Sequence, residues 1–207
     1  MNHETRSQFV FTKYRVDELR QCGDQFVADA LKLDVPGITT AGYTEFVLDW
    51  FAMTAPRGAR ADARPVQRLG NLNWRHAAPE TLALEIPPRK TSAEFLVDLC
   101  HSIPSPRDGR ITLVLESEWG DARSQQASIL AVVHDAAKVA HMTALAKVIV
   151  FASATGDHQP FLDAVAKLRQ AAGDSTPWLC IDLPWWAAPG ATWEPWAQVL
   201  AESSETP

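Results

Sequence analysis

The sequence predicts an α/β protein with a central mixed β-sheet between two layers of helices, in a three-layer α/β/α arrangement. Three strand-like apolar segments follow one another between residues 81 and 115, and helix and strand patterns then alternate from residue 124 to residue 183. Consecutive strands favour antiparallel pairing, whereas strand–helix–strand units favour parallel pairing. The predicted sheet would therefore contain both antiparallel and parallel pairs of strands.

The composition indicates one globular domain. The chain has 207 residues, of which 46% are apolar and 21% charged, and a domain of this size buries a substantial core. Within the single domain (1–207), the sequence divides into N-terminal helices (1–56), an arginine-rich loop (57–75), the sheet with its flanking helices (76–183) and a tryptophan-rich acidic tail (184–207).

Two amphipathic helices are predicted in the N-terminal part. In residues 16–33, apolar side chains recur at spacings of three and four, and the Pro-Gly pair at 36–37 ends the pattern. A second stripe of this kind covers residues 43–51. Both helices are expected to lay one face on the sheet.

The first three strands are predicted at residues 81–86, 94–100 and 110–115. The second segment could also form a helix, but the Pro- and Gly-containing turn at 104–109 favours a hairpin into the third strand. Asp98 would then lie in the middle of a strand, next to the strand that ends at Glu116.

Helices and strands alternate in the C-terminal half. Helices are predicted at 124–144, with Ser124 as the N-cap, and at 160–172; buried strands are predicted at 147–152 and 178–183. The inner stripe of the first helix is expected to contain Ile129, Leu130, Val133, Ala136, Ala137 and Ala140. Four tryptophans in the tail are expected to fold back on the body or to form an exposed binding surface: Trp185, Trp186, Trp193 and Trp196.

Charge and cysteine usage limit the class of protein. The net charge of −6 argues against a protein that coats nucleic acid by bulk electrostatics. The cysteines Cys22, Cys100 and Cys180 are far apart, which predicts small buried hydrophobes rather than disulfides or a zinc site. No signal-peptide pattern and no apolar run of about 18 residues are seen. A cytoplasmic protein with no membrane association is therefore expected.

The loop at 57–75 is rich in arginine, with Asp62 as its single acid. Guanidinium groups in such a loop suit the phosphates of nucleic acid, although a solvated loop has the same composition. The expected phosphate contacts are Arg57, Arg60, Arg64 and Arg68.

The acids at the end of the third strand are the strongest functional signal. Glu116 and Glu118 are two residues apart, so they share one face of a strand, while Ser117 between them points to the other face. Asp98 on the neighbouring strand would lie within reach. Carboxylate oxygens suit Mg²⁺ or Mn²⁺. The alternative is a strand that ends at Leu115, with both glutamates solvated in a turn.

This arrangement of Asp98, Glu116 and Glu118, together with the order of helix, three strands, helix and strand, resembles the PD-(D/E)XK nuclease superfamily with its restriction-endonuclease-like fold. The resemblance covers residues 17–152. It implies a hydrolase that cleaves phosphodiester bonds in DNA or RNA, with Asp98, Glu116 and Glu118 as metal ligands and Mg²⁺ or Mn²⁺ as the cofactor.

Two positions depart from the pattern of the superfamily. Val97 precedes Asp98 where a proline is usual, and Glu118 replaces the motif lysine. Some members carry Glu there and others take a lysine from the next helix, where Lys138 is the candidate for the catalytic lysine. The alternative is a catalytically inactive relative that acts as an interaction or regulatory module, with a partner protein or as a homodimer.

The same helix offers a second possibility, a metal site built on histidines. His134, Lys138 and His141 lie on one face at spacings of four and three. A polar face on an exposed helix is the favoured explanation of this spacing, with Asp135 and Lys138 paired at the surface. The glycines form no phosphate-binding loop pattern, which disfavours an enzyme that uses a nucleotide cofactor.

Overall fold

The computed structural model describes residues 9–33, 39–63, 66–67, 95–103, 110–119, 124–153, 156–184 and 194–201. Its four helices are α1 (Val16–Ala30), α2 (Thr40–Met53), α4 (Gln125–Ala140) and α5 (Gln159–Ala171). A six-stranded sheet contains, in spatial order, β1 (Arg60–Ala63), β4 (Leu99–Ile103), β5 (Arg110–Glu118), β6 (Ala146–Phe151), β7 (Trp178–Asp182) and β8 (Trp196–Leu200). The short strands β2 (Val66–Gln67) and β3 (Phe95–Leu96) pair separately.

The protein is α/β with a mixed sheet, as the sequence predicts. Strands β1, β4 and β5 pair antiparallel, β5, β6 and β7 pair parallel, and β8 pairs antiparallel with β7. Each parallel pair is joined by a helix, α4 between β5 and β6 and α5 between β6 and β7, because a crossover is needed to return the chain to the same end of a sheet. The carboxyl ends of β5, β6 and β7 therefore lie at one edge.

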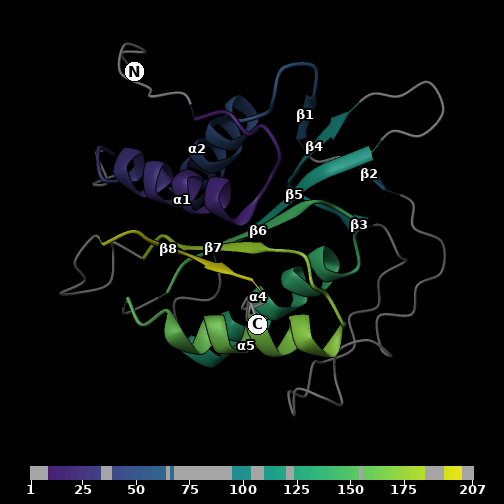
Figure 1. Ribbon diagram of the computed structural model, residues 1–207. Coiled ribbons are helices and arrows are strands. Elements are labelled where there is room, and N and C mark those ends of the chain that lie inside the picture. Colours follow the sequence, from purple (N-terminus) through teal and green to yellow (C-terminus); the bar gives the residue numbers. More distant parts are fainter. Residues whose placement is uncertain are drawn as a thin grey trace.

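Helices α1 and α2 lie on one face of the sheet, and α4 and α5 on the other (Figure 1). Side-chain alternation along β5 divides its residues between two apolar clusters. Leu113 and Leu115 belong to the cluster with α1 and α2, whereas Val114 belongs to the cluster with α4 and α5. Glu116 follows Val114 on the α4 side by the same alternation.

A buried histidine joins the sheet to the N-terminal segment. His101 on β4 is fully buried, and its ring lies 3.0 Å from the Tyr14 hydroxyl and 2.8 Å from the Phe51 carbonyl oxygen. A carbonyl oxygen only accepts, so Nε2 donates to Phe51 and Nδ1 accepts from Tyr14. Burial lowers the pKa of His101 to about 4, which keeps the ring neutral.

Helix α1 approaches the sheet closely at Gly23. A Cβ atom at this position would lie 3.0 Å from the Ala197 Cβ on β8 and 3.0 Å from the Leu179 Cδ1 on β7. The absence of a side chain at Gly23 therefore sets how closely the helix packs on the last two strands.

Replacing Gly23 by leucine is expected to destabilise the protein by about 1–3 kcal/mol, since added carbon atoms would force α1 away from β8. Urea unfolding followed by circular dichroism measures this loss. The control is Ala28→Leu, which adds the same side chain at an exposed position of α1. Equal stability of the two variants would contradict the close packing.

The predicted helices all form, with ends shifted by a few residues, and the strands at 110–115, 147–152 and 178–183 are confirmed as β5, β6 and β7. Ser124 is the N-cap of α4 and accepts from the Ala127 amide. Cys22, Cys100 and Cys180 are buried with free thiols, as predicted. The strand expected at 81–86 and the turn at 104–109 lie outside the described residues.

The described part of the tail folds back on the body, as one of the two expectations had it: β8 pairs with β7 at the opposite edge from β1, and Trp196 packs against the cluster with α4 and α5. Trp185, Trp186 and Trp193 lie outside the described residues.

Three predictions are corrected. Residues 60–63 form the edge strand β1, not loop. The segment 94–100 is not one strand, because a bend at Asp98 separates β3 from β4. The buried side of α4 is rotated from the predicted stripe, and its buried residues are Ser128, Val132, Val133, Ala136, Ala137 and Val139.

None of the helices described here is both long and apolar enough to cross a membrane.

Candidate active site

Glu116 is a carboxylate buried under α4 near the end of β5. Only 2% of its surface is exposed. The Lys138 ammonium on α4 lies 2.6 Å from its Oε1 atom. The strand thus continues past Leu115, and the predicted catalytic lysine contacts the predicted metal ligand. The alternative of two glutamates solvated in a turn is wrong for Glu116.

Lys138 binds a second carboxylate on its own helix. Its Nζ atom lies 2.6 Å from Asp135 Oδ1, and the side chains of both residues are 17% exposed. Residues three apart on a helix face the same way. One ammonium therefore links a carboxylate on α4 to a carboxylate on β5, and this pair is not the surface pair that the helix pattern alone indicated.

Asp98 lies at the bend before β4. Its backbone N–H donates to the Leu115 carbonyl oxygen over 3.1 Å, which places it at the start of the β4–β5 pairing, level with Glu116. Its carboxylate accepts from the backbone N–H of Ser117 at 2.7 Å and from the Ser117 hydroxyl at 2.6 Å. Charge-assisted bonds of this kind are strong and fix the Asp98 side chain at the end of β5.

These groups form one electrostatic cluster. Burial raises the pKa of Glu116, and the negative charges of Asp135 and Asp98 raise it further, whereas Lys138 lowers it. Burial alone would lower the pKa of Lys138, but the carboxylates of Asp135 and Glu116 outweigh it and raise that pKa. The lysine is therefore a permanent cation among three acids. Asp98, Glu116, Asp135 and Lys138 are called the acidic cluster below.

The remaining predicted site residues are Glu118 and the four arginines. Glu118 is the last residue of β5, half-buried and level with Phe151 of β6. Arg57 and Arg60 are exposed. Arg60 on β1 is level with Ser102 and hence with Ile111, five residues before Glu116, or about 17 Å along the strand.

Arg64 and Arg68 lie outside the described residues. Among the arginines predicted to contact phosphate, Arg60 lies on a strand of the sheet, and the strand pairing places it far from the acidic cluster. Its side chain extends from an edge strand near the start of β5, whereas the acidic cluster is near the end of β5.

Sequence reasoning missed Asp135 and Ser117 as parts of the cluster. Asp135 was seen only as a surface partner of Lys138, because a helical pattern does not reveal which strand residue lies across from it. Ser117 was expected only to point to the other face of the strand, and its hydroxyl donates to the Asp98 carboxylate. The predicted hairpin could have indicated this contact, because it places Asp98 beside the strand that contains Ser117.

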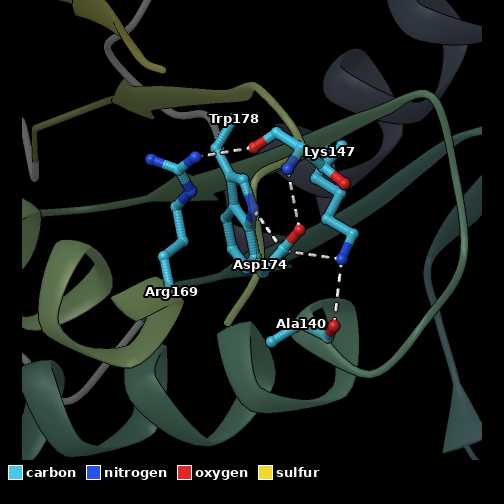
Figure 2. Close-up of polar contacts among 6 residues, drawn as sticks. Ala140, Lys147, Arg169, Asp174 and Trp178 are labelled. Carbon is cyan, nitrogen blue, oxygen red and sulfur yellow. Dashed lines mark hydrogen bonds and ion pairs between the residues drawn. The ribbon is translucent and has the colours of Figure 1, made fainter. Parts of the chain in front are cut away.

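A second buried ion pair lies at the C-terminal end of α4, beyond Lys138 (Figure 2). The Lys147 ammonium lies 2.7 Å from Asp174 Oδ2 and donates to the Ala140 carbonyl oxygen at 3.0 Å. The Trp178 indole N–H donates to the same carboxylate at 2.8 Å. Because Ala140 is the last residue of α4, a buried cation stabilises the negative end of the helix dipole and holds α4 against β6 and β7.

The loop after α5 completes this second cluster. Asp174 Oδ1 accepts from the Thr176 backbone N–H at 2.9 Å, and Arg169 donates to the Thr176 carbonyl oxygen at 2.9 Å. Burial lowers the pKa of Lys147, and hydrogen bonds from Lys147, Thr176 and Trp178 lower the pKa of Asp174 despite its burial.

The chemistry of the acidic cluster suits a hard divalent cation, since its donors are carboxylate oxygens. Within the described ranges, no group of three Asp, Glu, His or Cys side chains is arranged to hold a metal ion. Of the two histidines considered for a metal site, His134 is half-buried on α4, and His141 at the end of that helix is exposed.

The fold and the cluster define an α/β protein with a six-stranded mixed sheet, four described helices and a lysine among acids at the end of a central strand. Comparison of the chain with protein-family models, curated proteins and solved structures gives no match.

Proposed function

We propose that the protein is a divalent-metal-dependent nuclease with a three-layer, restriction-endonuclease-like fold, which hydrolyses phosphodiester bonds in DNA or RNA. The observation that carries the proposal is the contact between Lys138 and Glu116, at 2.6 Å. The motif expects a lysine beside this glutamate, and Lys138 reaches it from the following helix while Glu118 occupies the usual lysine position.

The arrangement of elements supports the fold. A helix precedes the antiparallel strands β4 and β5, and α4 then leads to β6, which is parallel to β5. The superfamily implies the order helix, three strands, helix and strand, and the helix and strand that follow β5 agree with its last part. The placement of α1 and α2 on one face and α4 and α5 on the other agrees with three layers (Figure 1).

Asp98 and Glu116 would hold Mg²⁺ or Mn²⁺, with Glu118 as a further ligand or as the base for the attacking water. The bound cation would polarise a phosphoryl oxygen and lower the pKa of its water. The Ser117 N–H and hydroxyl orient the Asp98 carboxylate toward the end of β5. Lys138 brings a positive charge that would stabilise the negative charge developing on the phosphate.

Cleavage assays test this proposal directly. The protein is incubated with single- and double-stranded DNA and with RNA in Mg²⁺ or Mn²⁺, and the products are separated by electrophoresis. We expect metal-dependent cleavage that a chelator abolishes and that falls below detection in Glu116→Gln. The control is Glu45→Gln, which removes the same charge at an exposed position of α2 and is expected to retain activity.

The nuclease proposal is abandoned if the wild-type protein, folded by circular dichroism, cleaves none of these substrates with either metal. The second candidate is then a catalytically inactive interaction module. One observation favours it, because Lys138 already neutralises Glu116 in the absence of metal. That candidate predicts a stable homodimer or partner complex in light scattering and no rise in Tm with Mn²⁺.

A further inference from the structure

We propose that residues 9–14 form a strap that acid releases. At neutral pH the strap is docked against α2 and β4, and protonation of Glu18 and His101 detaches it while the six-stranded sheet stays folded. The strap does not involve the acidic cluster, so this inference is independent of the proposed function.

Two buried aromatic rings anchor the strap. Phe11 is fully buried and Tyr14 is 4% exposed, whereas Val10 is 43% exposed. The rings of Phe11 and Tyr14 stack with their centroids 4.7 Å apart, and the Phe11 N–H donates to the Thr54 carbonyl oxygen at the end of α2 over 3.0 Å. The strap thus lies at the surface and is held from its inner side by a small number of contacts.

The backbone of Tyr14 is strained. Its φ angle is 56°, in the left-handed region that a residue with a Cβ atom rarely adopts. Contacts of the docked strap must offset this strain. The Tyr14 N–H donates to Glu18 Oε2 at 2.7 Å, and its hydroxyl donates to His101 Nδ1 at 3.0 Å. Both acceptors are groups that acid protonates.

Glu18 on α1 holds the backbone of the strap. Its Oε2 atom accepts from the N–H groups of Lys13 and Tyr14 at 2.9 and 2.7 Å, and the Thr12 hydroxyl also donates to this carboxylate. Burial acts to raise the pKa of Glu18, but hydrogen bonds from Thr12, Lys13 and Tyr14 outweigh it and lower that pKa. The docked strap therefore favours the charged carboxylate, and protonation of Glu18 weakens its hold on the strap.

His101 on β4 holds the side chain of Tyr14. The described groups around it are neutral, namely the Tyr14 hydroxyl, the Phe51 carbonyl oxygen of α2 and the hydroxyl of Thr112 on β5, which donates to the His101 carbonyl oxygen. Burial lowers the pKa of His101 to about 4 and raises the pKa of Tyr14 to about 12. An imidazolium would therefore be buried among neutral groups, and its Nδ1 atom could no longer accept from Tyr14.

Other charged side chains border the strap at its exposed side. Lys13, Arg15 and Asp17 are exposed, and Arg15 lies 3.6 Å from Asp17 in a surface pair. Asp62 on β1 is level with Cys100, so by side-chain alternation it lies on the opposite face of the sheet from the His101 ring. Solvent screens the exposed groups, which leaves Glu18 and His101 as the groups that link docking of the strap to pH.

The sign of the pH dependence follows from both groups in the same direction. The pKa of Glu18 and the pKa of His101 lie below their ordinary values while the strap is docked. The released state therefore binds more protons, and acid favours release. The effect begins below about pH 6.5, the ordinary value for histidine, and increases down to about pH 4. Release would uncover the rings of Phe11 and Tyr14, so an apolar surface becomes available only in acid.

Amide hydrogen exchange measured residue by residue, and corrected for the intrinsic effect of pH on exchange, tests the inference. We expect the protection of the Phe11, Lys13 and Tyr14 amides to fall by about tenfold or more between pH 6.5 and pH 4. The amides of Val148 and Val150 in β6 are expected to keep their protection over the same range, because the sheet stays folded.

Three variants assign the effect to its groups. His101→Gln can keep both hydrogen bonds of the ring but does not titrate, so the fall in protection is expected to be smaller. Glu18→Ala removes the acceptor and is expected to lower the protection of the Lys13 and Tyr14 amides already at pH 6.5. The control is Asp24→Ala, which removes a carboxylate at an exposed position of the same helix and is expected to behave as wild type.

Several outcomes overturn the inference. Full protection of the strap at pH 4 shows that acid does not release it, and an equal loss in β6 shows that the strap opens only with the whole fold. A wild-type pH profile in His101→Gln, or wild-type protection in Glu18→Ala at pH 6.5, removes that group from the switch and overturns the proposal as stated. If His101→Gln does not fold, the wild-type profile and Glu18→Ala decide.

Discussion

Replacing Lys147 by methionine is expected to lower the free energy of unfolding by about 3–5 kcal/mol, the usual cost of leaving one member of a buried ion pair alone. Methionine has a similar length but no charge. Its introduction leaves the Asp174 carboxylate, with 7% of its side chain exposed, without an ammonium. The Ala140 carbonyl oxygen at the end of α4 also loses its donor. Urea denaturation monitored by tryptophan fluorescence and circular dichroism measures the loss.

Two controls identify its cause. Lys167→Met, at an exposed position of α5, is expected to change stability by less than about 0.5 kcal/mol. The double variant Lys147→Met/Asp174→Asn removes both charges and is expected to be more stable than Lys147→Met alone, because no uncompensated carboxylate remains. A loss below about 1 kcal/mol in Lys147→Met would mean that the pair behaves like a solvated surface pair.

Acid is expected to destabilise the protein through His101. The folded protein holds the pKa of this imidazole at about 4, whereas an unfolded chain has the ordinary value of about 6.5. Between these values the unfolded state binds more protons, so stability falls as the pH falls. The full contribution is present above about pH 6.5, and its loss on acidification to pH 4 is roughly 3 kcal/mol.

Glutamine at position 101 isolates this contribution. Its amide can donate to the Phe51 carbonyl oxygen and accept from the Tyr14 hydroxyl, but it does not titrate. We expect His101→Gln to show a shallower fall in the free energy of unfolding between pH 6.5 and pH 4, measured by urea titrations at intervals across this range. Parallel pH profiles for wild type and variant would show that protonation of His101 does not limit stability.

The central part of the fold could be predicted because its sequence signals are local. The apolar runs that became β6 and β7 are buried on both faces, as parallel strands between helices are. Ser124 caps the helix that it was predicted to begin. In each case the pattern and the tertiary environment require the same residue types.

The edges of the sheet could not be predicted in this way. Strand β1 has the sequence Arg-Ala-Asp-Ala, an alternation only four residues long whose apolar members are alanines, which are weak strand formers. It pairs with β4 through the backbone. The bend at Asp98 could not be predicted either, because the apolar pattern of residues 94–100 fits one continuous strand. Its cause is tertiary, since the Asp98 carboxylate binds the Ser117 backbone and hydroxyl on another strand.

The acidic cluster was predicted in part. Glu116 was predicted as a metal ligand, and Lys138 was predicted as the lysine that replaces the one missing at position 118. The two side chains are in contact. Asp135 was not assigned to the cluster, because the rotation of α4 relative to β5 decides which helical side chains reach Glu116. The α4 residues that pack in the cluster on this face include Val132, Ala136 and Ala137, and the sequence periodicity located this buried side only approximately.

The close approach of α1 to β8 at Gly23 and Ala197 has a consequence for synthesis of the chain. The ribosome completes α1 long before it adds the residues of β8. The face of α1 that β8 covers is therefore not covered by this strand while the intervening residues are translated. Docking of the first helix on the last strand must then be a late, long-range event, and nascent chains that stop short of residue 196 leave that face of the helix uncovered.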